Sequence, residues 1–322
     1  MKQKTSVWAI LLGCALSPLV TAAPQPCSYA DLMPEYQVFA ARTATLSAEQ
    51  RAAAFRKDFA ATHPDYYSPE VFGDDAKLQA RAERFFDPAK RAAGFPDKPP
   101  LTDTRLAAMG TVIGPQFLEQ QRRITRVFTD FECSSLVEFG VSLLSFDGHP
   151  TEFAGRHHLL FGVDVIAILH DEADMPSFLD HEIFHIYHEQ VLADQIPKGE
   201  TPGWYTMWLE GLATYVSQRM NPKLDAQHVL WSPSDIVARM QKETPRAARL
   251  LLADIEKTGP QQQRWFVSRT QVDGLPARAG YYLGYLFAKS VGEGVPLPQL
   301  AHRPLDQVHQ QEVAFLTKLS QQ

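Results

Sequence analysis

The sequence predicts an α+β fold that is mostly helical, with a small mixed sheet ahead of a buried central helix. Helical patterns and helix caps fill residues 24–135, which indicates a helical N-terminal region. The segments 136–146 and 159–169 are rich in β-branched and apolar residues, as expected for strands. Helical patterns then return and continue to the C-terminus. At 322 residues the chain is long enough for one large domain or two modest ones.

We interpret residues 1–22 as a secretory signal peptide, because lysines precede a short apolar run that ends in small residues. A lipoprotein signal ending at Cys14 is the alternative, since Leu11-Leu12-Gly13-Cys14 resembles a lipobox. The mature chain is expected to be exported, to the periplasm or the medium, without a membrane span. Cleavage would leave Cys27 and Cys133, which are expected either to pair or to remain free thiols.

Residues 23–135 are expected to form helices that pack around the rest of the chain. Ser47 and Gln50 form a capping box, and the helix that they start should end near His63. A second helix is predicted over residues 75–91. A third should begin at Thr102 or Asp103, break at Gly114-Pro115 and resume as far as Phe128.

Turn residues at 147–150 and 154–155 separate the predicted strands. The edge strand of such a sheet can pair with an extended peptide. His157 and His158 are neighbours on a strand and point to opposite faces, so a structural or surface role is expected for both. Three aspartates in this part are expected to serve turns or caps, with support of a ligand histidine as the alternative: Asp164, Asp171 and Asp174.

The helix predicted over residues 177–193 carries a metal-binding pattern. His181 and His185 are four residues apart and therefore face the same side, where two imidazoles can bind one metal ion. Glu182 is placed to take a proton from a water molecule on that metal. The helix is apolar nearly all round, which predicts burial. His188 continues the stripe and is expected to form a pocket wall, or else to support a ligand.

A third ligand is expected, because zinc hydrolases use three protein ligands and leave one position for water. The metzincin pattern would place a histidine where this chain has Val191. Glu210 lies instead on the next predicted helix, over residues 204–216, where a carboxylate in apolar surroundings needs a charged partner. Gly211 and Ala213 are small enough to let the two helices approach closely.

Residues 177–217 resemble the gluzincin metallopeptidases, in which His-Glu-x-x-His on one helix and a glutamate on the next hold zinc. The resemblance implies one Zn²⁺ ion bound by His181, His185 and Glu210, with Glu182 as the general base. It also implies a zincin-like catalytic region over residues 136–322 with flanking helices. Thermolysin-like members have an aspartate where this chain has Thr214, so support for the ligands must come from elsewhere. More loosely, the chain is similar to uncharacterised bacterial predicted zinc-dependent proteases.

Gluzincins commonly use a downstream tyrosine or histidine to stabilise the oxyanion. Here Tyr281 and Tyr285 share one face of a predicted helix and are the candidates, with amphipathic core residues as the alternative. Arg278 is expected at the surface, with binding of a substrate carboxylate as its alternative role. Further helices are predicted over residues 233–240, 245–255 and 305–319.

The function expected is that of an exported zinc-dependent hydrolase, a metallopeptidase acting on a peptide or protein substrate. A zinc-binding or assembly protein without turnover is one alternative, and a metal-free helical protein with a chance motif is another. The basic residues are scattered and the formal net charge is −6, which argues against nucleic acid as a partner.

Overall fold

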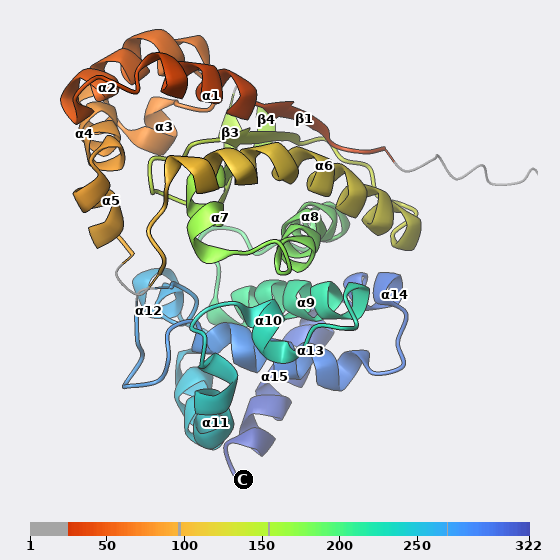
Figure 1. Ribbon diagram of the computed structural model, residues 1–322. Coiled ribbons are helices and arrows are strands. Elements are labelled where there is room, and N and C mark those ends of the chain that lie inside the picture. The colour runs from red at the N-terminus through yellow and green to blue at the C-terminus, as the bar shows by residue number, and fades with distance from the viewer. Residues whose placement is uncertain (1–24, 96–97, 154, 269) are drawn as a thin grey trace, which may run out of the picture.

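The computed structural model describes residues 25–95, 98–153, 155–268 and 270–322, so the predicted signal peptide and Cys14 lie outside the described residues. The described chain is mostly helical with one four-stranded mixed sheet, which confirms the predicted fold class (Figure 1).

The N-terminal region is helical after its first few residues. Its helices are α1 (Met33–Arg42), α2 (Ala48–Ala54), α3 (Pro69–Phe72), α4 (Asp75–Phe86), α5 (Pro88–Ala93) and α6 (Asp103–Val127). The capping box of Ser47 and Gln50 is confirmed, and short π- and 3₁₀-helical turns extend α2 to Thr62. The helical stretch predicted over residues 75–91 is confirmed except at Asp87, which leaves the helix and caps α5, so that the stretch forms two helices.

The sheet has the strand order β1-β2-β4-β3, with bounds β1 (Ser28–Asp31), β2 (Leu136–Gly140), β3 (Gly148–Phe153) and β4 (Arg156–Gly162). β1, β2 and β4 are parallel, and β3 is the antiparallel edge strand. Three expectations were wrong. β1 lies in a region predicted to be helical, the turn predicted at 147–150 is largely strand β3, and the second predicted strand changes into helix α7 (Val163–Leu169).

A buried carboxylate shapes the turn between β2 and β3. Asp164 accepts hydrogen bonds from the backbone N–H of Ser142 at 2.6 Å and of Leu144 at 2.7 Å. Leu143 and Leu144 have φ of 55° and 66°, a left-handed conformation that branched side chains rarely adopt. Because the carboxylate satisfies the turn's backbone donors, it stabilises this conformation and directs the chain into the edge strand. Asp164 therefore serves a turn, as expected.

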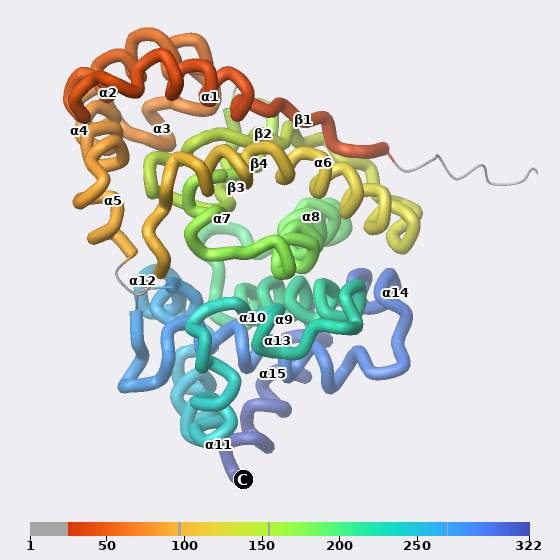
Figure 2. The backbone as a smooth tube through the Cα atoms, viewed as in Figure 1, coloured from red at the N-terminus to blue at the C-terminus, as the bar shows by residue number. Residues whose placement is uncertain are grey.

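Two central helices connect the sheet to the C-terminal part of the chain. They are α8 (Met175–Leu192) and α9 (Gly203–Met220), and α8 packs against both α6 and α9 (Figure 2). Phe139 and Phe161 stack on neighbouring strands, and the second ring contacts Phe178 of α8. This contact fixes the start of α8 against the sheet.

The C-terminal part is a cluster of helices below α8 in the view of Figure 1. Its members are α10 (Ala226–Leu230), α11 (Ile236–Asp254), α12 (Gly259–Gln263), α13 (Ala279–Gly292), α14 (Leu297–Ala301) and α15 (Leu305–Leu319). The helix predicted over residues 305–319 is confirmed. The two helices predicted on either side of residues 241–244 are one continuous helix, α11, which contains Pro245.

A disulfide joins the segments that lead into the neighbouring strands β1 and β2. Cys27 and Cys133 pair, with their Cα atoms 4.8 Å apart, and a β-bridge between Gln25 and Glu132 lies beside them. This answers the question that the sequence left open between a bridge and free thiols. Within the described residues, no helix has the length and apolar character needed to cross a membrane.

Candidate metal centre

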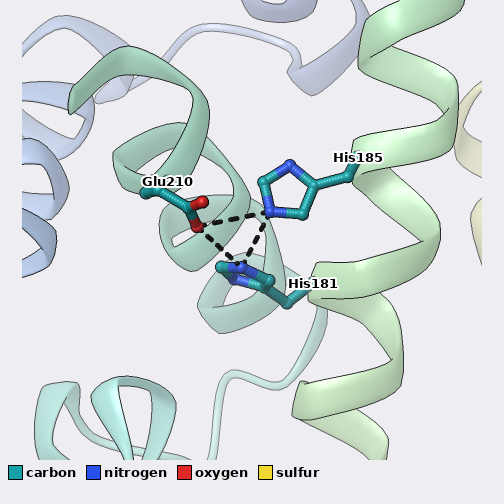
Figure 3. A group of neighbouring side chains, drawn as sticks. All are labelled: His181, His185 and Glu210. Atoms are coloured by element: carbon teal, nitrogen blue, oxygen red, sulfur yellow. Dashed lines mark hydrogen bonds and ion pairs between the residues drawn. The ribbon is translucent and has the colours of Figure 1, made fainter. Parts of the chain in front are cut away.

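Three side chains from α8 and α9 converge on one point (Figure 3). The Nε2 atoms of His181 and His185 are 3.0 Å apart, and Glu210 Oε2 lies 3.2 Å and 3.3 Å from them. Ligand atoms about 2.0–2.1 Å from a tetrahedral zinc ion are roughly 3.3 Å from one another. The group can therefore hold a metal ion, and its spacing and donor types fit zinc.

The local structure explains this convergence. One turn of α8 separates His181 from His185, so both imidazoles leave the same side of the helix. The side chain of His181 is only 2% exposed, whereas those of His185 and Glu210 are 22% and 20% exposed. The group therefore has a buried side and an open side, as a metal that exchanges a water ligand requires.

The three side chains differ strongly in how tightly they hold a proton. Burial lowers the pKa of His181 to about 4. For His185, burial acts in the same direction, but the charge of Glu210 and its hydrogen bond outweigh it and raise the pKa to about 9. The charge of His185 and hydrogen bonds from both histidines hold the Glu210 pKa well below its usual range, against the effect of burial. A metal ion bound at this group would require both imidazoles in their neutral form, so metal and protons compete for it.

Glu182 lies beside the group and faces the same cavity. Its carboxylate packs against the start of β3, where a Cβ atom on Gly148 would come within 3.0 Å of Glu182 Oε2. Burial raises its pKa to about 8, and the nearby negative charges of Asp147 and Glu210 act in the same direction. A carboxyl group with a raised pKa can both accept and return a proton near neutral pH.

The structure separates the two candidate tyrosines. Tyr281 lies beside the metal group, with its ring 6.3 Å from that of His181. Burial and the negative charge of Glu210 raise its pKa well above the usual value, so the phenol stays protonated and can donate. Tyr285 donates instead to Gln218 Oε1 at 2.5 Å and does not line the cavity. The structure therefore does not bring Tyr285 to the group, and the candidate oxyanion donor is Tyr281.

Support around the ligands is sparse. Among the described residues, His181 Nδ1 has no hydrogen-bond partner. Asp171 caps the turn before α8, and Thr214 bonds the backbone carbonyl of Glu210 at 2.8 Å. His188 is fully buried against Phe184 and does not line the cavity, so its expected role as a pocket wall is wrong.

A cavity of about 1660 Å³ opens over the group. Its walls include edge strand β3, the metal-binding face of α8, and residues near the start of α13. Ile196 and Val267 are exposed apolar side chains on its lining, at 38% and 42% exposure. His157 is exposed on this lining, whereas buried His158 bonds Glu138 through Nδ1 at 2.6 Å, which matches the structural or surface roles expected.

Sequence reasoning missed two residues that line the cavity, and it placed a third wrongly. Trp231 and His170 contact His181 and Phe178 respectively and were not singled out. They come from the ends of short helices, where no periodic pattern could indicate them. Arg278 was expected at the surface but is only 7% exposed. Its position before the predicted tyrosine-bearing helix was the only available signal.

No family model, curated protein or solved structure matches this chain. The interpretation of the site therefore rests on its donor atoms and on the groups around them.

Proposed function

We propose that the chain is an exported zinc-dependent hydrolase of the gluzincin type, a metallopeptidase that cleaves peptide bonds. The observation that carries the proposal is the position of Glu182 beside the histidine and glutamate donors, on the same cavity. Two histidines and one carboxylate are a donor set typical of catalytic zinc, which keeps a fourth position for water.

The roles of the side chains follow from their chemistry. When bound, zinc lowers the pKa of a water ligand and polarises a carbonyl group. Glu182 accepts the proton of the attacking water and returns it to the leaving amine. Tyr281, held protonated, donates a hydrogen bond to the carbonyl oxygen as negative charge develops there.

A peptide is the substrate class that the walls of the cavity favour. β3 is one of the two edge strands of the sheet and has no partner on its outer side among the described strands. Residues Pro150, Thr151 and Glu152 of this strand line the cavity. An extended peptide can add to such an edge through main-chain hydrogen bonds, which would lay its backbone across the metal centre.

Export is supported by chemistry outside the site. The Cys27–Cys133 disulfide is typical of proteins that fold in an oxidising compartment. It agrees with the interpretation of residues 1–22 as a signal peptide, which remains a prediction.

The sharpest test compares the wild type with Glu182→Gln. We expect the variant to keep stoichiometric zinc and to lose peptide hydrolysis by roughly 10²–10⁴-fold, because only the general base is removed. Metal analysis and cleavage of a mixed peptide library, followed by mass spectrometry, measure both quantities.

Two further variants complete the test. Glu210→Ala should lose zinc together with activity, whereas Glu172→Gln, in the exposed turn before α8, should keep both. Full activity of Glu182→Gln would rule out the mechanism. A zinc-loaded wild type that cleaves no peptide would favour a binding or assembly role.

A further inference from the structure

A buried guanidinium group lines the cavity next to the metal centre. Arg278 directly precedes α13 and is 7% exposed. Its Nη1 donates to the carbonyl oxygens of Leu230 at 2.9 Å and Ser232 at 3.4 Å. Among the described residues, its other two nitrogens have no hydrogen-bond partner, yet neither is sealed from solvent. Two donors are therefore free to meet a ligand in the cavity.

This charge lacks a carboxylate partner among the described residues. Arginine stays protonated in proteins, and a buried charge is normally paired. Here the guanidinium lies over the rings of Tyr281 and Trp231, 3.9 Å and 5.3 Å from their centroids. Arg239 lines the same cavity but lies 3.9 Å from Asp235. The missing partner is thus a feature of Arg278 and not of every arginine in the cavity.

The backbone of Arg278 is held in an unusual conformation. Its φ of 61° is in the left-handed region, which costs a residue with a Cβ atom about 1–2 kcal/mol. Contacts on the guanidinium and the start of α13 stabilise this conformation. Backbone outliers of this kind cluster at active sites and ligand-binding positions.

Two rings set the spacing between Arg278 and the metal centre. The rings of Trp231 and Tyr281 lie 5.1 Å and 6.3 Å from the ring of His181, and the guanidinium of Arg278 contacts both rings. The guanidinium is therefore linked to His181 of the metal group through a single shared ring neighbour. An extended chain advances about 3.3–3.6 Å per residue, so this separation corresponds to one or two residues of a peptide.

We propose that Arg278 binds the C-terminal carboxylate of the substrate peptide, so that cleavage releases the last one or two residues. The inference rests on the proposed function. Guanidinium donors match a carboxylate in a two-pronged geometry, and Lys98 adds a further positive charge to the cavity lining. The reaction is plain hydrolysis: the acyl carbon gains the water oxygen, the C–N bond breaks, and the amine leaves with a proton from water.

The test measures binding in the zinc-loaded Glu182→Gln protein, which should hold peptides without cleaving them. The probes are N-acetylated hexapeptides of mixed sequence, each made as a free acid and as a C-terminal amide. Equilibrium dialysis with mass spectrometry gives a dissociation constant for each pair. We expect the free acids to bind at least tenfold more tightly, because only they present a charged acceptor to Arg278.

Substitutions at Arg278 test whether this residue causes the tighter binding of free acids. In the same background, Arg278→Gln should reduce the acid-to-amide ratio to near one, and Arg278→Lys should leave a smaller preference. Arg239→Gln is the matched control and should keep the full ratio. Circular dichroism and zinc content show whether each variant is folded. The comparison of free acids with amides is also made in the protein that keeps Arg278, so it does not depend on the folding of a variant at this position.

The outcomes separate this inference from the proposed function. Equal binding of acids and amides, or a preference that survives in folded Arg278→Gln, overturns the inference. If the wild type then still cleaves peptides at internal bonds, the hydrolase proposal stands. If the preference for free acids depends on Arg278 but the wild type cleaves no peptide, carboxylate binding is supported and the hydrolase proposal is overturned. Binding of neither peptide form overturns both.

Discussion

At the residue scale, the two tyrosines of α13 illustrate how one helical turn changes chemistry. Tyr281 lies against the metal group, where burial and a carboxylate keep its phenol protonated. Tyr285 lies one turn further and donates to Gln218 of α9. The pair offers a matched comparison, because both are tyrosines on the same helix and substitution by phenylalanine removes only the hydroxyl group of each.

Tyr281→Phe should therefore lower kcat by about 10- to 100-fold and leave the zinc content unchanged, because it removes a donor needed mainly in the transition state. Tyr285→Phe is the control and should leave kcat within about twofold of the wild type. Steady-state kinetics on a cleaved peptide, with metal analysis, tests both. Equal losses in the two variants would show that the hydroxyl of Tyr281 has no special role.

The metal group could be predicted from the sequence because its signals lie within single helices. Spacing along one helix fixes the relation of His181 to His185, and the polar Glu210 stands out in an apolar helix. Arg278 and Trp231 could not be assigned in this way. Their places in the cavity depend on how segments distant in sequence fold together, for which a single sequence carries no periodic signal.

At the scale of elements, α9 and α13 approach so closely that only glycine fits between them. A Cβ atom on Gly211 would lie 2.3 Å from the carbonyl carbon of Gly284. From the sequence, we expected Gly211 to allow a close approach between α9 and the histidine-bearing helix α8. In the structure the helix that approaches Gly211 is α13. Because Gly211 follows Glu210, this contact also positions the carboxylate of the candidate metal group and, through α13, Tyr281.

Gly211→Ala should destabilise the fold by about 1–3 kcal/mol or more, because an added methyl group meets backbone that cannot move aside. It should also weaken zinc binding by displacing Glu210. Thr206→Ala on the same helix, a half-buried site, is the control. Thermal unfolding and competition with a zinc chelator measure the two effects, and an unchanged melting temperature would contradict the packing argument.

Proline misled the prediction of elements. The rule that proline ends a helix predicted breaks at Pro115 and near Pro245, yet α6 and α11 run through both positions. Proline inside a helix costs about 3 kcal/mol relative to alanine. α6 offsets this by burying a row of apolar side chains that includes Ile113, Phe117 and Ile124. Such compensation comes from partners elsewhere in the chain and cannot be read locally.

α15 contains a buried carboxyl group, Glu312, which should make stability depend on pH. Among the residues that the structure describes, neither of its oxygens has a hydrogen-bond partner, and burial raises its pKa well above 4.5. The folded protein therefore holds this proton more tightly than the unfolded chain. The stabilising contribution is complete below pH 4.5 and is lost as pH rises toward the folded-state pKa.

Glu312→Leu should consequently be more stable than the wild type at pH 8, by about 1–3 kcal/mol, with a difference that shrinks toward pH 4. Chemical denaturation across this pH range measures it. Exposed Glu293→Gln is the control and should show no such trend. A difference that is independent of pH would show that the carboxyl group is neutral throughout.

At the scale of the whole molecule, the disulfide closes a long segment of chain. Cys27 and Cys133 are 106 positions apart, and the segment between them contains all the helices from α1 to α6. Because a cross-link restricts the unfolded chain, a loop of this length is expected to stabilise the fold by about 2–5 kcal/mol.

The double substitution Cys27→Ser and Cys133→Ser should lower the free energy of unfolding by that amount while zinc content stays the same, because the metal centre lies on α8 and α9. Denaturant unfolding with and without a reducing agent checks this. The wild type treated with reductant should match the variant, and a loss of zinc in either would mean that the bridge supports the metal centre directly.

The parallel pairing of β1 with β2 constrains how the protein can be assembled during synthesis. Ser28 aligns with Leu136, so the first strand emerges from the ribosome long before its partner. Contacts between such distant positions form slowly, and an unpaired strand edge is prone to pair with other chains. β1 therefore stays without its partner until β2, which follows α6, is in place, and pairing of its edge with other chains is the main risk in that interval.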